Sequence, residues 1–376
     1  MKRKLIITLL FFFVLHFTLA AQRWTAEKAS SWYKELSWQV GCNYVPFNAI
    51  NQLEMWQATT FDSAQISKEL SWAKSIGMNT LRVFLHDLLW QQDSTGFIKR
   101  LDLFLKICQK HGIRPILVLF DSVWDPEPRL GKQREPRPGV HNSGWVQSPG
   151  SASLKDESEH PRLETYVKSI VKVFANDKRI LAWDVWNEPD NMNTDNYTEP
   201  ADKVVLVNKL LPKVFDWCRS AQPMQPLTSG VWITWDGHNW SDSAKWTVTE
   251  RIQLQQSDII SFHCYSDSAT FEKLIQYLLP LGRPLLCTEY LARSYKNTFE
   301  AILPLGRKYN VAMINWGFVA GKTQTYLPWD SWKQPYVNGR QPAVWHHEIF
   351  YPDGKPYRKE EVELLRRLTG KTTISQ

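Results

Sequence analysis

Several common catalytic motifs are missing from this 376-residue sequence. It contains no HExxH zinc-protease motif, no GxSxG serine-hydrolase motif and no glycine-rich phosphate-binding loop. Zinc proteolysis, serine esterase chemistry and nucleotide binding therefore have no support in the sequence. Low-complexity tracts and strong internal repeats are absent as well, so a solenoid or a disordered linker is not indicated.

Cysteine is scarce. The chain has five cysteines, an odd number, and each lies in an apolar run that is typical of a strand or a helix. A disulfide framework needs an even set at regular spacing, so we expect mostly buried thiols. The five positions are Cys42, Cys108, Cys218, Cys264 and Cys287.

A strong charge excess is also missing. The formal net charge is +7, and without the three basic residues at positions 2–4 the 45 Lys and Arg fall to 42, against 38 Asp and Glu. Nucleic-acid binding usually requires clustered basic residues on one face. The composition therefore gives no support for a nucleic-acid partner.

The N-terminus has the pattern of a secretory signal. Basic residues at positions 2–4 precede an apolar run from Leu5, and small residues follow at Ala20 and Ala21. We expect a signal peptide over residues 1–20, cleaved near Ala20, and a secreted or periplasmic mature chain with no membrane contact. An uncleaved anchor is the alternative, although His16 interrupts a run that is already short for a membrane span.

Beyond residue 20, short β-branched or aromatic runs alternate with helix-like segments, which favours parallel βαβ units. Eight such strand-like runs lie at residues 38–45, 79–85, 113–120, 180–188, 226–232, 258–265, 284–291 and 311–318. Helices are expected near 62–76, 97–111, from Pro161, from Pro200 toward Trp217, and more faintly near 243–256, 268–280, 297–309 and 358–369. Eight repeats predict an α/β fold, a (β/α)8 barrel over residues 21–376 with long loops at its C-terminal face.

Two long connections and the tryptophan content are unusual. Residues 121–160 and 319–357 are longer than most loops of a compact domain, and such loops are commonly functional walls or lids. They carry five of the nineteen tryptophans, which favours ordered walls: Trp124, Trp145, Trp329, Trp332 and Trp345. We expect these connections to close one end of a cleft.

Polar residues appear where the predicted strands end. In a (β/α)8 barrel only these C-terminal ends share a pocket. The fourth run ends in Asn187 and Glu188, and the seventh ends in Glu289. The other ends supply Arg82, His263, Tyr265 and Trp316.

Two carboxyl groups across one pocket suit the cleavage of a glycosidic bond. One neutral acid protonates the leaving oxygen, and one anion attacks the sugar or activates water. An arginine and a tyrosine hydroxyl beside one carboxylate favour its charged form, whereas burial raises the pKa of the other. A single Glu after a strand is more often structural, so the hypothesis depends on the pair and on Asn187 beside it.

These residues resemble glycoside hydrolase family 5 and, more widely, the retaining glycosidases of clan A, over roughly residues 38–320. The motif Trp186-Asn187-Glu188-Pro189 is similar to the clan's fourth-strand end, and Glu289 matches the seventh. The resemblance implies that Glu289 is the nucleophile and Glu188 the acid/base. It further implies that Asn187 binds the sugar 2-hydroxyl, that Arg82 and Tyr265 keep Glu289 ionised, that His263 belongs to the site, and that Trp316 lies under the sugar.

The sequence departs from many family 5 cellulases after the third run. Those enzymes have a His where this chain has Asp121. We take Asp121 and Trp56 as candidate substrate contacts, with surface or packing roles as the alternative. Arg82 as an ion-pair residue, His263 as a buried hydrogen-bonding residue and Trp316 as core packing also stay open.

No cofactor or metal is expected. The run His346-His347-Glu348 could suggest a metal site, but adjacent histidines rarely converge on one ion.

Three functions remain in competition. The leading hypothesis is a secreted retaining β-glycoside hydrolase acting on a β-linked polysaccharide or oligosaccharide. An exo-acting β-mannosidase-like or transglycosylating enzyme of the same clan is the second, and a non-catalytic carbohydrate-binding barrel is the third. The sugar, endo or exo attack, and the oligomeric state stay open.

Overall fold

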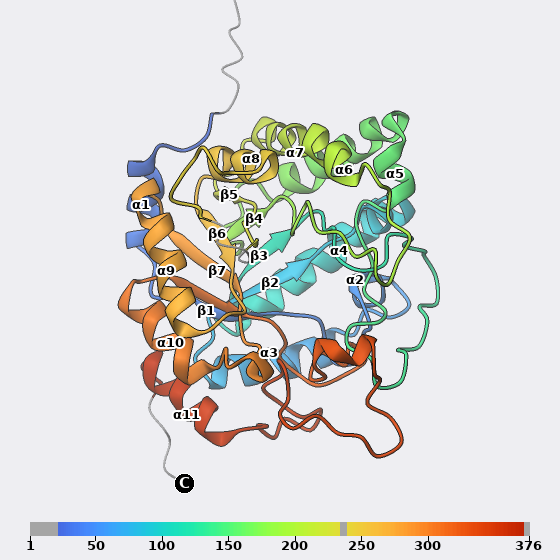
Figure 1. Cartoon of the computed structure of the whole chain (residues 1–376). Coiled ribbons are helices and arrows are strands. Elements are labelled where there is room, and N and C mark those ends of the chain that lie inside the picture. Colours follow the sequence, from blue (N-terminus) through green and yellow to red (C-terminus); the bar gives the residue numbers. More distant parts are fainter. Residues whose placement is uncertain (1–21, 234–238, 372–376) are drawn as a thin grey trace, which may run out of the picture.

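The computed structural model describes residues 22–233 and 239–371. The predicted signal peptide, with Ala20, lies outside the described residues. Eight parallel strands form one sheet with the order β5-β4-β3-β2-β1-β8-β7-β6, and helices surround it (Figure 1). The predicted (β/α)8 barrel is therefore confirmed.

Each strand lies inside one of the eight predicted runs. The strands are β1 (Val40–Asn43), β2 (Thr80–Phe84), β3 (Arg114–Val118), β4 (Ala182–Asp184), β5 (Leu227–Thr228), β6 (Ile260–His263), β7 (Leu285–Glu289) and β8 (Ala312–Asn315). The barrel closes between β5 and β6 through a parallel bridge of Val231 with Phe262.

Among the described residues, eight helices follow the predicted segments with shifted ends, and α1 (Ala26–Lys34), α2 (Gln52–Trp56) and α5 (Ser151–Lys155) were not predicted. The eight are α3 (Ser63–Ser75), α4 (Asp87–Lys110), α6 (His160–Val173), α7 (Lys203–Ser220), α8 (Val248–Gln256), α9 (Ser268–Leu278), α10 (Phe299–Lys308) and α11 (Lys359–Leu368). Asp62 caps α3 through Gln65 N, as the sequence predicts, and α8 begins with a capping box of Thr247 and Glu250. The predicted helix 97–111 is the second part of α4, which kinks at Asp93.

Helix α1, which was not predicted, closes the end of the barrel opposite the strand tips. Ala29 and Tyr33 are buried in a separate apolar cluster with side chains from the lower parts of the barrel, namely Ile116, Leu181, Ala182, Ile259, Leu286, Ala312 and Ile314. The Tyr33 hydroxyl also donates to the carbonyl of Asn310 at 2.9 Å.

All five cysteines are free and buried, as expected. Within residues 22–233 and 239–371, no helix has the length and apolar character that a membrane crossing requires.

The two long connections meet each other above the barrel. Asn142 N donates to Thr323 O at 2.7 Å, and His141 N donates to Ser331 Oγ at 3.0 Å. The rings of Trp124 and Trp332 stack with centroids 5.0 Å apart. Residues 121–160 and 319–357 therefore form a joined wall, which we call the double wall.

The double wall also contacts the segment after β1. Asn51 Nδ2 donates to Gly144 O, and Lys322 N donates to Phe47 O, both at 2.9 Å. This places the double wall over the β1–β2 side of the barrel mouth.

Candidate active site

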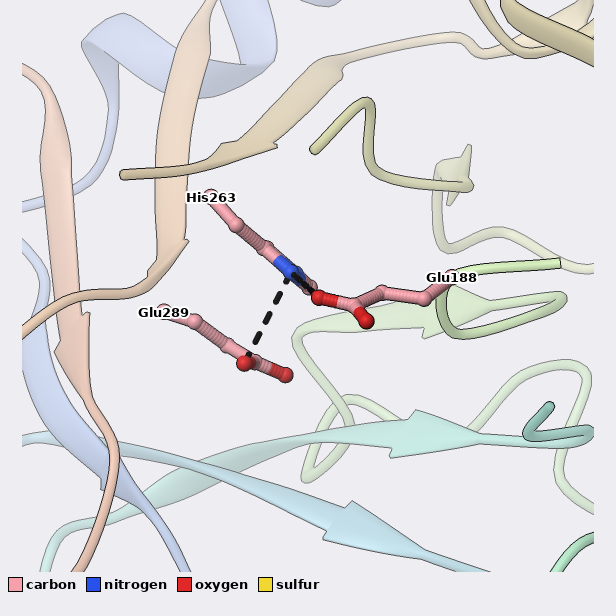
Figure 2. Close-up of side chains that lie close together, drawn as sticks. All are labelled: Glu188, His263 and Glu289. Atoms are coloured by element: carbon pink, nitrogen blue, oxygen red, sulfur yellow. Dashed lines mark hydrogen bonds and ion pairs between the residues drawn. The ribbon is translucent and has the colours of Figure 1, made fainter. Parts of the chain in front are cut away.

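The two glutamates selected from the sequence face each other at the strand ends. Glu188 follows β4, Glu289 ends β7, and His263 at the end of β6 lies between them (Figure 2). One ligand atom from each of the three side chains lies within 4.8 Å of the other two. The carboxyl groups are therefore close enough to act on one bond.

Glu188 is held by two polar neighbours. Its Oε1 lies 2.7 Å from His263 Nδ1, and its Oε2 accepts a hydrogen bond from Asn191 Nδ2 at 2.7 Å. Its backbone has a φ of 39°, a strained conformation for a non-glycine residue that often marks a functional position. Burial raises the pKa of Glu188 to about 7, against the smaller lowering effect of Asn191. The side chain is thus suited to hold a proton near neutral pH.

Glu289 has stronger support for its charged form. Arg82 Nη1 donates to its Oε1 at 3.0 Å, and the Tyr265 hydroxyl donates to its Oε2 at 2.7 Å. Burial raises the pKa of Glu289, while His263, Arg82 and Tyr265 oppose that rise. Because two donors hydrogen-bond to Glu289, we expect it to lose its proton before Glu188 does.

Arg82 lies beneath the site and has no exposed surface. It bonds Asp184, Asn43, Glu289 and Asn187 at 2.7–3.0 Å. As the resemblance implies, Arg82 supports the charged form of Glu289. Because four protein groups surround its guanidinium, Arg82 does not bind substrate itself. It fixes Glu289 and Asn187 from below.

Asp121 is likewise buried below the site. Its Oδ1 accepts from Asn187 Nδ2 at 2.9 Å and its Oδ2 accepts from Trp145 Nε1 at 2.6 Å. Asp121 does not line the cavity, so its predicted substrate contact is wrong. With Arg82 on Asn187 Oδ1 and Asp121 on Nδ2, both ends of the Asn187 amide are held in place, which leaves one N–H of Asn187 for a ligand.

The predicted substrate contact of Trp56 is also wrong. Its ring is fully buried in the core against Phe61, Phe97 and Phe104, and its Nε1 donates to Phe84 O. Trp56 ends helix α2, and its ring packs against α4 rather than at the strand tips, which the sequence alone did not reveal.

The glutamates open into a cavity of about 580 Å³. Asn187, His263, Tyr265 and Trp316 line it, as predicted, together with both glutamates. The half-buried Trp316 packs edge-to-face against Phe84 and Trp145, so one surface of the cavity is a fixed aromatic ring.

Several lining residues were not selected as site residues from the sequence. They are Val123, Trp124, His141, Asn142, Asn191, Met192, Asn193, Trp232, Ser266, Tyr295, Trp329 and His347. Trp124 and Trp329 lie in the connections expected to form walls, which was the one available signal. The others depend on loop conformations that no local pattern specifies.

The cavity is enclosed on one side. Among the described residues, none from the segments that follow β1 and β2 lines it, whereas six residues of the double wall do: Val123, Trp124, His141, Asn142, Trp329 and His347. The residues Asn191, Met192, Asn193 and Trp232, from the segments after β4 and β5, line the cavity near Glu188.

Only one group of described His, Cys, Asp and Glu side chains could converge on a cation, namely Glu188, His263 and Glu289. Their atoms already pair with each other, with Arg82 and with Tyr265. The run His346-His347-Glu348 does not form such a group in the described part of the chain.

Comparison with known proteins identifies a matching family and structures with the same fold. A family model described as Cellulase (glycosyl hydrolase family 5) matches residues 43–334. A search of curated protein sequences found no match.

Solved structures share the fold at low sequence identity. An exo-β-1,4-mannosidase from Opitutaceae bacterium strain TAV5 superposes with a TM-score of 0.57 and 19% identity, covering 89% of this chain and 60% of that one. A GH5_18 protein from Streptomyces cattleya, in complex with Manβ1-4GlcNAc, superposes with a TM-score of 0.60 and 13% identity, covering 90% of this chain and 83% of that one. An endo-β-1,4-mannanase from Thermotoga petrophila superposes with a TM-score of 0.54 and 14% identity, covering 90% of this chain and 77% of that one. The chain thus spans about 60% of the length of the Opitutaceae mannosidase.

Proposed function

Because this chain belongs to glycosyl hydrolase family 5 and is an O-glycosyl hydrolase of clan A, we propose that it is a retaining β-glycosidase with Glu289 as nucleophile and Glu188 as acid/base. The observation that carries the proposal is the unequal environment of the two glutamates. Arg82 and Tyr265 donate hydrogen bonds to Glu289, whereas Glu188 is buried with a pKa of about 7.

The separation of the glutamates supports retention. Retaining pairs are about 5–5.5 Å apart and inverting pairs roughly 6.5–9.5 Å, because an inverting enzyme needs room for a water. Oxygens of Glu188 and Glu289 within 4.8 Å fit the shorter class.

In the proposed first step, the Glu289 carboxylate attacks the anomeric carbon while Glu188 protonates the departing oxygen. A covalent glycosyl-enzyme forms and the aglycone leaves as an alcohol. In the second step, Glu188 removes a proton from water, whose oxygen displaces Glu289. Asn187 directs its remaining N–H toward the sugar, where such a contact strengthens in the transition state.

We further propose exo attack on a neutral β-mannoside. The double wall closes the β1–β2 side, which supports a pocket for a chain end over an open groove. Among the residues that the structure describes, no Lys or Arg lines the cavity, so an acidic sugar would find no countercharge from them. The named structural neighbours include an exo-β-1,4-mannosidase and endo-mannanases, which favours mannosides as the first substrates to test.

Export of the mature chain remains a proposal that depends on the signal pattern of residues 1–20. We likewise propose that residues 21–376 form one catalytic barrel, with the boundary set by the end of that signal pattern.

The experiment is reducing-end release from β-mannan, β-xylan, β-glucan and their short oligosaccharides, with Glu289→Ala as the blank. Release of single mannose units from chain ends, absent in the variant, is the expected result. Cleavage at internal bonds would overturn exo attack, and turnover of another sugar alone would overturn the mannoside. Transfer to sugar acceptors at high substrate concentration would favour the transglycosylase. Binding without turnover that survives Glu289→Ala would favour a carbohydrate-binding barrel.

A further inference from the structure

Three histidines with no part in the proposed chemistry lie together in the double wall. The ring centroids of His141 and His347 are 5.3 Å apart, and His346 lies 4.2 Å from His347. His141 and His347 line the cavity, whereas His346 does not. The cluster therefore has two rings at the cavity surface and one behind them.

The hydrogen bonds of the two lining rings fix where their protons lie. His141 Nδ1 lies 2.7 Å from Leu327 O, and His347 Nδ1 contacts Leu291 O. A carbonyl oxygen can only accept, so Nδ1 carries the hydrogen in both rings. A neutral imidazole has a single N–H, which leaves Nε2 as a bare acceptor.

Burial keeps both rings neutral. It lowers the pKa of His141 to about 4 and that of His347 well below its usual value. Neither Nε2 has a hydrogen-bond partner among the residues that the structure describes. Because Nδ1 anchors each ring to the wall and the ring lines the cavity, Nε2 is the polar atom left for a bound ligand.

A third unpaired acceptor lies beside the two rings, and its oxygen is buried rather than exposed to the cavity. Asn142 is 1% exposed and lines the cavity, and its Oδ1 has no hydrogen-bond partner in the described chain. The ring of Trp329 lies 5.9 Å from that of His347 and supplies an apolar surface beside the acceptors. This end of the cavity thus offers acceptors and aromatic faces, and no lysine or arginine of residues 22–233 or 239–371 lines it.

We propose that His141 and His347 are an acceptor pair for free hydroxyl groups of the terminal sugar, and that they restrict the enzyme to neutral sugars unsubstituted at those hydroxyls. The inference rests on the proposed exo-glycosidase function and adds which groups select the terminal sugar. An O-acetyl or O-methyl group has no hydrogen to donate, and a carboxylate would face two lone pairs. With ring centroids 5.3 Å apart, the two rings are close enough to face one pyranose.

The test uses substitutions that separate the two ring nitrogens. His141→Asn and His347→Asn keep an N–H near the Nδ1 position, so the bond to the wall carbonyl survives, but they remove the Nε2 acceptor. His347→Gln places an amide oxygen near Nε2 and serves as the rescue variant. His346→Asn is the matched control, because His346 belongs to the same buried cluster and does not line the cavity.

Each protein is assayed with p-nitrophenyl β-D-mannopyranoside and its 3-, 4- and 6-deoxy and O-methyl analogues. In the wild type, we expect loss of at least one hydroxyl to lower kcat/KM by about ten-fold, the effect of one hydrogen bond. In His141→Asn or His347→Asn that penalty should shrink to about two-fold, while His347→Gln and His346→Asn retain it. Equal penalties in all five proteins would overturn the proposal, as would unimpaired cleavage of every O-methylated analogue.

A wild type that cleaves no β-mannoside would sink the mannoside assignment separately. The acceptor pair is then tested by calorimetric titration of Glu289→Ala with methyl β-D-manno-, gluco- and galactopyranosides. Binding that weakens in His347→Asn but not in His346→Asn supports the pair. Binding of none of these sugars, or equal binding by both variants, overturns it.

Discussion

Nδ1 of His263 lies 2.7 Å from Oε1 of Glu188, and both side chains are buried. Burial lowers the pKa of His263 to about 4, so the ring is neutral wherever Glu188 titrates. Above a pH of about 4, the Glu188 carboxyl therefore holds the proton that the pair can lose. Glu188, with a pKa of about 7, loses this proton as pH rises.

The first prediction concerns the alkaline limb of kcat/KM. The active form has Glu188 protonated and Glu289 ionised, so on the alkaline side activity should fall as pH rises through about 7, where Glu188 loses its proton. Asn191→Ala removes a donor that lowers the pKa of Glu188, so the limb should move to higher pH. A pH profile of kcat/KM measures both.

Asn193→Ala is the control for this shift, because Asn193 lines the same cavity and is not a hydrogen-bond partner of Glu188. A limb that moves equally in both variants, or toward lower pH in Asn191→Ala, would remove Glu188 from the acid role.

The second prediction separates the nucleophile from the acid/base. With an activated aryl glycoside, Glu289→Ala should lose at least about 10⁴-fold in kcat, because no glycosyl-enzyme forms. Added azide should restore turnover in both alanine variants, with the glycosyl azide in the α configuration from Glu289→Ala and in the β configuration from Glu188→Ala. NMR of the products reads the anomeric centre, and the reverse pairing would exchange the two roles.

The third prediction tests Arg82 as the common support of Glu289 and Asn187. A lysine cannot reproduce the four contacts of the guanidinium, so Arg82→Lys should lower kcat by about 100-fold. It should also lower the free energy of unfolding by about 3 kcal/mol, since Asp184 is left poorly paired in the interior. Steady-state kinetics and urea denaturation measure the two effects.

Arg293→Lys is the matched control. Arg293 is also buried and makes two hydrogen bonds to Glu361, and it does not line the cavity. We expect it to lose stability and to keep kcat. A similar loss of kcat in both variants would mean that Arg82 acts only through stability.

The sequence predicted the barrel because each strand is an apolar run bounded by turn residues, and that pattern is local. It also predicted the neighbourhood of Glu188, Glu289, His263, Tyr265 and Trp316, since side chains at the ends of parallel barrel strands must share one mouth. The depth at which each side chain lies in the barrel could not be predicted from the sequence. Arg82 and Asp121 follow the same rule as the others but point below the cavity floor.

Residues of the double wall could not be predicted individually. His141 and His347 are about two hundred positions apart, and they meet because two long connections bond to each other. No periodicity links such segments. Helix α1 was missed for a related reason: its apolar residues pack against the barrel end, a contact that no local pattern specifies.

The fourth prediction concerns the barrel end opposite the site. Tyr33→Ala removes a buried ring from the cluster that α1 forms, together with the hydrogen bond to Asn310 O. The free energy of unfolding should fall by about 3 kcal/mol, the usual cost of truncating a buried aromatic residue. Because Tyr33 lies at the end remote from the strand tips, kcat at 25 °C should be unchanged. Tyr33→Phe, the control, should lose about 1 kcal/mol, and a large loss of kcat would contradict the assignment of α1 to stability.

The fifth prediction concerns the orientation of Asn187. Asp121 accepts hydrogen bonds from Asn187 Nδ2, Trp145 Nε1 and Val123 N, so all three partners are donors. In Asp121→Asn one acceptor becomes an NH2 group, which must face one of these donors. The amide of Asn187 then loses its bond to a carboxylate and keeps the one to Arg82, so its N–H is directed at the sugar less firmly.

We therefore expect Asp121→Asn to lower kcat by about 10- to 100-fold with a smaller effect on KM, because the contact that is lost strengthens in the transition state. Asp125→Asn is the control: Asp125 lies in the same connection and pairs with Arg134, away from Asn187. The effect should also depend on the substrate, since a 2-deoxy glycoside has no hydroxyl for Asn187 to bind. If Asp121→Asn lowers kcat equally for the 2-deoxy and the parent glycoside, Asp121 does not act through Asn187.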